Sequence, residues 1–132
     1  NAAFWYVIDH GLTHNKNINI LLKLKNAITL LKNKYSELKF AEVPANKTKA
    51  LASAVVAQPV SISVEADSLA FQFYKSGVFS KKCGTDLDHG ITLVGYGNLA
   101  GVDFWKAKNS WGPTWGMQGY ILIAKSDQDG PG

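Results

Sequence analysis

The chain of 132 residues, 46% of them hydrophobic, is long enough for one domain with a modest core. Its 14 basic residues are all lysines and are concentrated in residues 1–58. The chain has no arginine for bidentate hydrogen bonds to guanine or phosphate and no glycine-rich phosphate-binding loop. We therefore expect no nucleic-acid partner. No apolar run approaches the roughly 20 residues of a membrane helix, and no signal peptide is visible, so we expect no membrane partner.

Helical spacing dominates the first third of the chain. Residues 1–10 carry apolar side chains at helical intervals and are followed by Gly11, a common helix terminator. Residues 13–40 combine leucine and isoleucine with six lysines and almost no acids. Their apolar positions 21, 24, 28 and 31 are three or four residues apart, which predicts an amphipathic helix.

The rest of the chain predicts short helices and several strands. Residues 48–57 have a polar start and an alanine-rich body, typical of a short helix that ends before Pro59. Residues 60–65 alternate as a strand, and residues 68–74 predict a helical turn. The further predicted strands are residues 77–79, 89–95, 104–109 and 119–124. Six glycines suit the tight turns of an antiparallel barrel: Gly95, Gly97, Gly101, Gly112, Gly116 and Gly119.

A series of short motifs runs from Gln58 to Ile123. In order they are Gln-Pro-Val-Ser at 58–61, Ala-Phe-Gln-Phe-Tyr-Lys-Ser-Gly-Val-Phe at 70–79, Cys-Gly-Thr at 83–85, Asp-His-Gly at 88–90, Val-Gly-Tyr-Gly at 94–97 and Lys-Asn-Ser-Trp-Gly-Pro-Thr-Trp-Gly at 108–116. Their order and spacing resemble the C-terminal half of papain-like cysteine peptidases of the plant papain and cathepsin L type. The resemblance implies an α+β fold, with residues 41–132 as an antiparallel β-barrel-like peptidase domain and residues 1–12 as a remnant of the helical N-terminal domain.

The chain departs from this family in two places. The family's nucleophilic cysteine lies in its N-terminal half, in a Gln-x-x-x-x-x-Cys-Gly-Ser-Cys-Trp context that does not occur here. The resemblance therefore implies a cysteine endopeptidase of which this chain, inactive alone, supplies only the histidine and the asparagine. Residues 13–40 lack the family's Tyr-Pro-Tyr signature, and both a corrupted sequence and a divergent loop remain open. The alternative function is a pseudogene-like product or a binding module that keeps the barrel without chemistry.

His89 and Asn109 are the catalytic residues that the resemblance implies. An imidazolium beside a thiol lowers the thiol pKa, and the same ring then protonates the leaving amine. Asn109 would accept the imidazole N–H through its side-chain oxygen and so fix the tautomer of the ring. We expect about 2.7–3.2 Å between this oxygen and the imidazole nitrogen. Trp111 would shield that hydrogen bond from water, which strengthens it. Without this motif context, His89 would be read as a structural histidine at a strand edge.

The substrate-binding residues that the resemblance implies are Ser63, Leu87, Asp88, Gly90 and Trp115. Ser63, Leu87 and Gly90 would surround the pocket for the side chain that precedes the scissile residue, and their sizes favour apolar or aromatic side chains. We expect Asp88 to tune the electrostatics beside the histidine. Trp115 would line the leaving-group side of the cleft, and packing in the core is compatible with that role.

Cys83 is the only cysteine, and the resemblance implies that it forms a disulfide with a partner outside this chain. A small buried thiol is the alternative. Asn46-Lys47-Thr48 is a candidate N-glycosylation sequon, a short motif that also arises by chance.

Other expected partners follow from the resemblance as well. They are a polypeptide substrate, proteinaceous inhibitors and the N-terminal half of the peptidase, in the secretory pathway and a vacuolar, lysosomal or extracellular setting. Asp86, Asp88 and His89 lack the further spaced ligands of a metal site. We therefore expect no metal and no cofactor.

Overall fold

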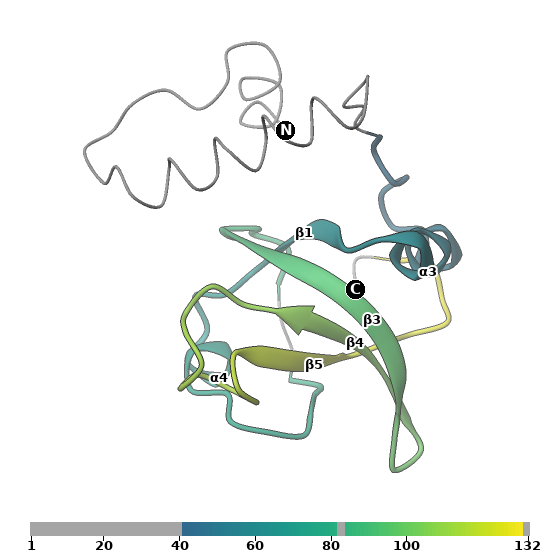
Figure 1. Cartoon of the computed structure of the whole chain (residues 1–132). Coiled ribbons are helices and arrows are strands. Elements are labelled where there is room, and N and C mark those ends of the chain that lie inside the picture. Colours follow the sequence, from purple (N-terminus) through teal and green to yellow (C-terminus); the bar gives the residue numbers. More distant parts are fainter. Residues whose placement is uncertain (1–40, 82–83, 131–132) are drawn as a thin grey trace, which may run out of the picture. The chain divides into compact units, whose positions relative to one another are not determined.

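The computed structural model describes residues 41–81 and 84–130, nearly all within one compact unit, Val43–Gly132. Its elements in chain order are α3 (Thr48–Ala57), β1 (Val60–Val64), α4 (Leu69–Gln72), β2 (Val78–Phe79), β3 (His89–Leu99), β4 (Val102–Lys108) and β5 (Tyr120–Ala124) (Figure 1). The predictions for residues 1–12, for residues 13–40 and for Cys83 concern positions outside the described residues. The α+β fold class is confirmed.

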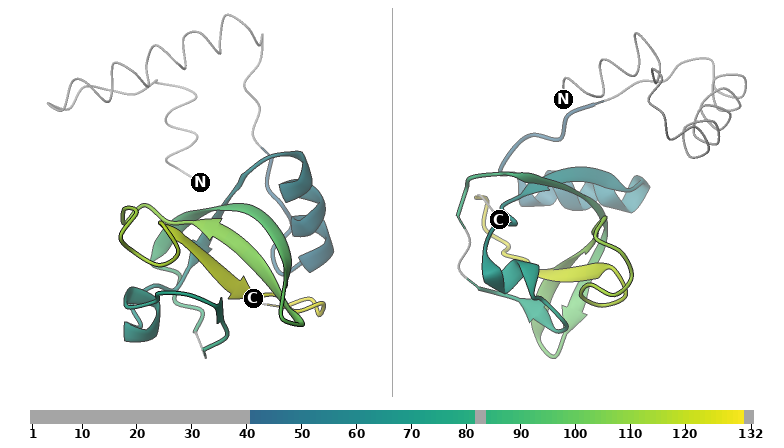
Figure 2. Two further views of the ribbon diagram at one scale, coloured as in Figure 1. Left: turned by 60° about the horizontal axis from the view of Figure 1, so that its bottom comes forward. Right: turned by 90° about the vertical axis from the view of Figure 1, so that its left-hand side faces the viewer.

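The five strands form one sheet in the order β1-β3-β4-β5-β2. Three of the four neighbouring pairs are antiparallel, in line with the expected antiparallel barrel-like domain, and only the edge strand β2 runs parallel to its neighbour β5 in the described sheet. The sheet curves strongly, with β3 and β4 as long bent ribbons (Figure 2). No helix in the described part of the chain is long and apolar enough to cross a membrane.

Helix α3 starts at the residue that the sequence predicted, but its cap comes from the other end of the chain. Its N-cap residue, Lys47, makes no capping hydrogen bond with its own side chain. Instead the backbone N–H of Thr48 donates to Asp129 Oδ1 at 3.1 Å, and the Thr48 hydroxyl donates to the carbonyl of Gln128 at 3.0 Å. The Lys47 ammonium pairs with Asp129 Oδ2 at 2.8 Å. Residues 128–129 therefore satisfy the backbone donor that a local capping residue would satisfy.

Strand β3 is longer than predicted, because two of the expected turn glycines lie inside it. Gly95 sits where the β3–β4 register shifts, which marks a bulge. Gly97 pairs with Phe104, whose ring would lie only 2.9 Å from a Cβ at this position. The turn itself is Ala100-Gly101, with φ of 51° and 84°, as a two-residue hairpin between right-twisted strands requires.

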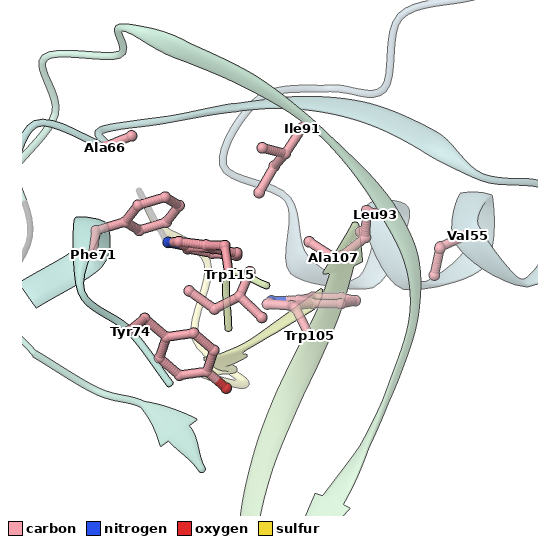
Figure 3. Packing of buried hydrophobic residues seen from close by; sticks show 10 residues of the cluster. Val55, Ala66, Phe71, Tyr74, Ile91, Leu93, Trp105, Ala107 and Trp115 are labelled. Atoms are coloured by element: carbon pink, nitrogen blue, oxygen red, sulfur yellow. The ribbon is translucent and has the colours of Figure 1, made fainter. Parts of the chain in front are cut away.

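The core lies on the concave face of the sheet (Figure 3). Leu93, Ala107 and Ile121 are completely buried there. An aromatic layer of Phe71, Tyr74 and Trp115 packs beside them, with ring centroids 5.3–5.6 Å from Trp115. Its polar atoms are satisfied by backbone: the Tyr74 hydroxyl donates to the Gly77 carbonyl at 2.6 Å, for example. This layer supports the loop that follows β4.

Candidate active site

His89 and Asn109 meet because β3 and β4 are antiparallel neighbours. His89 is the first residue of β3, and Asn109 directly follows β4. His89 Nε2 lies 2.8 Å from Asn109 Oδ1, within the distance expected from the sequence. Asn109 is only 2% exposed, and its backbone N–H donates to the carbonyl of Gly119 at 2.9 Å. A buried, anchored carboxamide thus faces the imidazole.

The orientation of the Asn109 amide follows from a second contact. Asn109 Oδ1 also accepts the backbone N–H of Ser110 at 2.7 Å. Exchanging the oxygen and nitrogen would place two donors against each other, so the oxygen must stay on this side. Because a carboxamide oxygen only accepts, His89 Nε2 carries the hydrogen. In the neutral ring Nδ1 is then the free basic nitrogen.

The same orientation leaves the other atom of the amide unsatisfied. Asn109 Nδ2 is buried and has no hydrogen-bond partner among the described residues. An unmade hydrogen bond of this kind costs about 1–3 kcal/mol. Such groups are rare in native structures and tend to occur where function imposes the geometry.

Trp111 lies over the imidazole. The two rings stack with centroids 5.0 Å apart and planes 30° from parallel. Trp111 is 40% exposed, but its ring is also fixed edge-on by Phe71 at 5.6 Å and by Trp115 at 5.4 Å. The aromatic core therefore determines where this ring sits above His89.

Two carboxylates tie the loop before His89 to the end of β1. Asp88 Oδ1 accepts the backbone N–H of Ala66 at 2.8 Å, and the Asp88 N–H donates to the Val64 carbonyl at 3.2 Å. Glu65 Oε2 accepts the backbone N–H of Asp86 at 3.0 Å. Asp88 thus has a positioning contact in addition to its expected electrostatic effect. Sequence reasoning missed Glu65, because its partner is a backbone donor with no signature of its own.

The expected substrate-binding residues fall into two groups. Ser63 and Gly90 are directly opposite each other in the β1–β3 register, next to the Val64–His89 pair, and Leu87 is 60% exposed nearby in sequence. Trp115, in contrast, is 8% exposed and belongs to the core cluster. Its indole N–H donates to the carbonyl of Gln72, the last residue of α4, at 2.9 Å, and this hydrogen bond helps to hold α4 in place.

An open groove of about 460 Å³ adjoins His89. It is lined by Ala66, Asp67, Gln72, Phe73, Asp88, His89 and Trp111. Sequence reasoning did not single out Asp67, Gln72 or Phe73 individually, although the last two belong to the 70–79 motif. In residues 41–81 and 84–130 no group of histidine, cysteine or acidic side chains is arranged to hold a metal ion.

The chain is similar to known proteins in both sequence and structure. The family model described as papain family cysteine protease matches residues 1–130. The senescence-specific cysteine protease SAG39 of Oryza sativa subsp. indica is 40% identical over 135 residues, which cover 96% of this chain and 38% of that protein. The oryzain beta chain of Oryza sativa subsp. japonica is 52% identical over 87 residues, 66% of this chain and 19% of that protein. The chain thus spans well under half of these relatives.

Two solved structures resemble the described fold. The proform of Amb a 11, a ragweed pollen cysteine protease, has a TM-score of 0.70 at 35% identity over 96% of this chain and 40% of its own. Bromelain from Ananas comosus, in complex with the E64 inhibitor, has a TM-score of 0.63 at 43% identity over 67% of this chain and 42% of its own.

Proposed function

Because this chain belongs to the papain family of cysteine proteases, we propose that His89 is the general acid–base of a peptide-hydrolysing site and that Asn109 positions it. The single observation that carries the proposal is the 2.8 Å contact between His89 Nε2 and Asn109 Oδ1, with the amide oriented by the Ser110 N–H. Among the residues that the structure describes, the buried Asn109 Nδ2 has no hydrogen-bond partner, and this supports the proposal further, because a non-catalytic binding module gains nothing from that cost.

The chemistry follows from the tautomer. His89 Nδ1 takes the proton of a cysteine thiol, and the resulting thiolate attacks the carbonyl carbon of the scissile amide. As the C–N bond breaks, Nδ1 gives the proton to the leaving amine, and an acyl thioester remains. Water then attacks the thioester while Nδ1 accepts its proton, which releases the acid and restores the thiol. Throughout, Nε2–H stays bonded to Asn109.

We place the nucleophilic thiol in a part of the protein N-terminal to this sequence. The relatives are much longer than this chain. The Cys-Gly-Thr motif at 83–85 resembles the context of the family's structural cysteine rather than that of its nucleophile. The 132-residue chain is accordingly proposed to be inactive alone. The complete site would take polypeptide substrates and react with the epoxide E-64, which is bound in the solved Carica candamarcensis protease and in bromelain.

The setting proposed for the complete protein is the secretory pathway. Asn46 of the candidate sequon is exposed, in a turn with φ of 58°, and is open to a glycan. Cys83 would form its disulfide in the same oxidising compartment.

One experiment tests the proposal. The 132-residue chain and the protein expressed from its full coding sequence are each incubated with a fluorogenic dipeptide amide, with and without a thiol-directed epoxide. We expect epoxide-sensitive hydrolysis by the longer protein only, and its loss in the His89→Ala variant. Epoxide-sensitive hydrolysis by the 132-residue chain would show that Cys83 is a nucleophile and would overturn the assignment. Undiminished hydrolysis by His89→Ala would do the same for the histidine.

A further inference from the structure

The charged side chains that line the groove beside His89 include two carboxylates. Asp67 and Asp88 both line it, and among the described residues no lysine does. Its apolar walls are aromatic: Phe73 is 71% exposed and Trp111 is 40% exposed. A side chain with an apolar stem and a cationic end fits such a surface, because aromatic faces attract cations and cover methylene groups.

The two carboxylates of the groove differ in what they already bind. Asp88 Oδ1 accepts the backbone N–H of Ala66, so part of its bonding capacity is used. Among the described residues, no hydrogen bond or ion pair is found for the Asp67 carboxylate; only its backbone carbonyl is engaged, by the Gln72 amide at 2.7 Å. Asp67 is exposed at the groove wall. Its carboxylate is therefore available to a ligand.

The segment that carries Asp67 is held in place. The next residue, Ser68, caps α4, with its hydroxyl oxygen accepting the Phe71 N–H at 3.2 Å. Phe71 is 2% exposed and packs against Trp111 and Trp115. A ligand would not have to order this backbone on binding, which lowers the entropic cost.

The position of the groove indicates which part of a substrate it meets. Ser63, Leu87 and Gly90, assigned to the acyl side of the scissile bond, are not among its lining residues. The groove lies instead along His89 and its stacking partner Trp111. Since His89 protonates the leaving amine in the proposed mechanism, the segment that begins with this amine passes here.

We propose that Asp67 is a specificity-determining residue that selects lysine or arginine in the leaving-group segment of the substrate. This inference rests on the proposed function, and it specifies which residues the peptidase site prefers on the leaving-group side of the scissile bond. The Asp67 carboxylate pairs with the cationic end, while the stem lies on Phe73. An exposed ion pair of this kind gives a preference of about two- to fivefold over an uncharged side chain of equal length. Salt at high concentration removes the preference.

The test uses the 132-residue chain labelled with fluorotryptophan, whose ¹⁹F spectrum reports the four tryptophans separately. The Trp111 resonance is identified with a Trp111→Phe variant. Three dipeptide amides that differ only in their first residue are titrated in: lysyl-alanine, norleucyl-alanine and glutamyl-alanine amide. The variants are Asp67→Asn and, as a matched control, Asp86→Asn, which removes an exposed acid outside the groove.

We expect the lysyl peptide to shift Trp111 with an affinity about two- to fivefold above that of the norleucyl peptide, and the glutamyl peptide to bind weakest. Asp67→Asn should equalise the lysyl and norleucyl affinities, and Asp86→Asn should preserve the difference. Equal affinities in the native chain would overturn the role of Asp67 but leave the groove as a peptide site. If no peptide perturbs Trp111 at any concentration, the inference fails together with the substrate side of the proposed function.

Discussion

Two asparagines at opposite ends of the β3–β4 pair make the same kinds of contact in opposite surroundings. At the hairpin end, Asn98 Oδ1 accepts the Gly101 N–H at 3.0 Å, and its Nδ2 donates to Asp103 at 2.6 Å. At the site end, Asn109 Oδ1 accepts the Ser110 N–H and faces His89, but Nδ2 has no partner among the described residues. Asn98 is exposed, whereas Asn109 is buried.

Under the proposed function, the difference separates a contact that serves folding from one that serves catalysis. Asn98 uses both ends of its amide to close a tight turn, so its contribution to stability explains its presence. Asn109 is held in a place where half of its amide has no partner within the described part of the chain, which costs stability. What the protein gains there is a fixed acceptor for the imidazole. Substitutions at the two ends should therefore affect different properties.

The largest expected effect is that of Asn109→Ala on catalysis by the complete enzyme. Loss of a hydrogen bond to a charged imidazolium weakens transition-state stabilisation by about 1.5–3 kcal/mol, so kcat/KM should fall roughly 10- to 100-fold. Asn98→Ala, the matched control, should leave kcat/KM unchanged. The comparison breaks if both variants lose activity equally, since Asn109 would then act only through the stability of the fold.

Aromatic contacts at the two ends sharpen the same comparison. Trp111 stacks on His89, while Tyr96 contacts Trp105 edge-on at 5.7 Å near the hairpin. Trp111→Ala should lower kcat/KM about two- to tenfold, the value of an aromatic pair, and expose the His89–Asn109 bond to water. Tyr96→Ala should leave steady-state kinetics unchanged. An unaffected Trp111→Ala enzyme would show that shielding contributes nothing.

At the hairpin end, one substitution should stabilise the fold without touching the site. Ala100 has φ of 51°, a conformation that alanine adopts at a cost and that asparagine tolerates better. Ala100→Asn should raise the free energy of unfolding by about 0.5–1 kcal/mol in a denaturant titration. The Trp111 environment should stay the same. Destabilisation would mean that the turn is not strained at Ala100.

The smallest expected effect concerns acid pH and the clamp between α3 and residues 128–129. The hydrogen bond from Lys47 lowers the pKa of Asp129 below its ordinary value of 3.8. Its stabilising contact is therefore present above the unfolded pKa and is lost as pH falls through the lower folded pKa. The Thr48 amide resonance should shift in that window, and Asp129→Asn should abolish the shift. A Thr48 shift that survives in Asp129→Asn would contradict the clamp.

The local pattern was sufficient to predict much of this fold. Alanine-rich residues 48–57 and alternating residues 60–65 gave α3 and β1 almost to the residue. Gly95 and Gly97 were predicted to lie in turns, but both lie within β3. A glycine that allows a bulge or the close approach of Phe104 looks the same in the sequence as a glycine in a turn. Strand β2 was predicted at residues 77–79, but its parallel pairing with β5 depends on tertiary packing, which no local pattern encodes.

The site was predicted in the same uneven way. The family resemblance of the motifs implied the arrangement of His89, Asn109 and Trp111, and the antiparallel pairing of β3 with β4 brings the first two together. Asp88 and Glu65 accept hydrogen bonds from backbone N–H groups, which all residues except proline carry. No sequence motif could therefore reveal these contacts. Asp67 lines the groove from the segment just before α4, and no motif in the sequence marked that position.

The most direct test of this account is the tautomer of His89. Nitrogen-15 NMR of the histidine-labelled chain at alkaline pH distinguishes a protonated ring nitrogen from a bare one by chemical shift. The His89 signal is assigned with a His89→Gln variant and should show Nε2 protonated and Nδ1 bare. Asn109→Ala should give a mixture of the two tautomers, whereas Asn98→Ala should keep the single tautomer. A neutral His89 protonated at Nδ1 would contradict the account, because no basic nitrogen would then be left for a thiol.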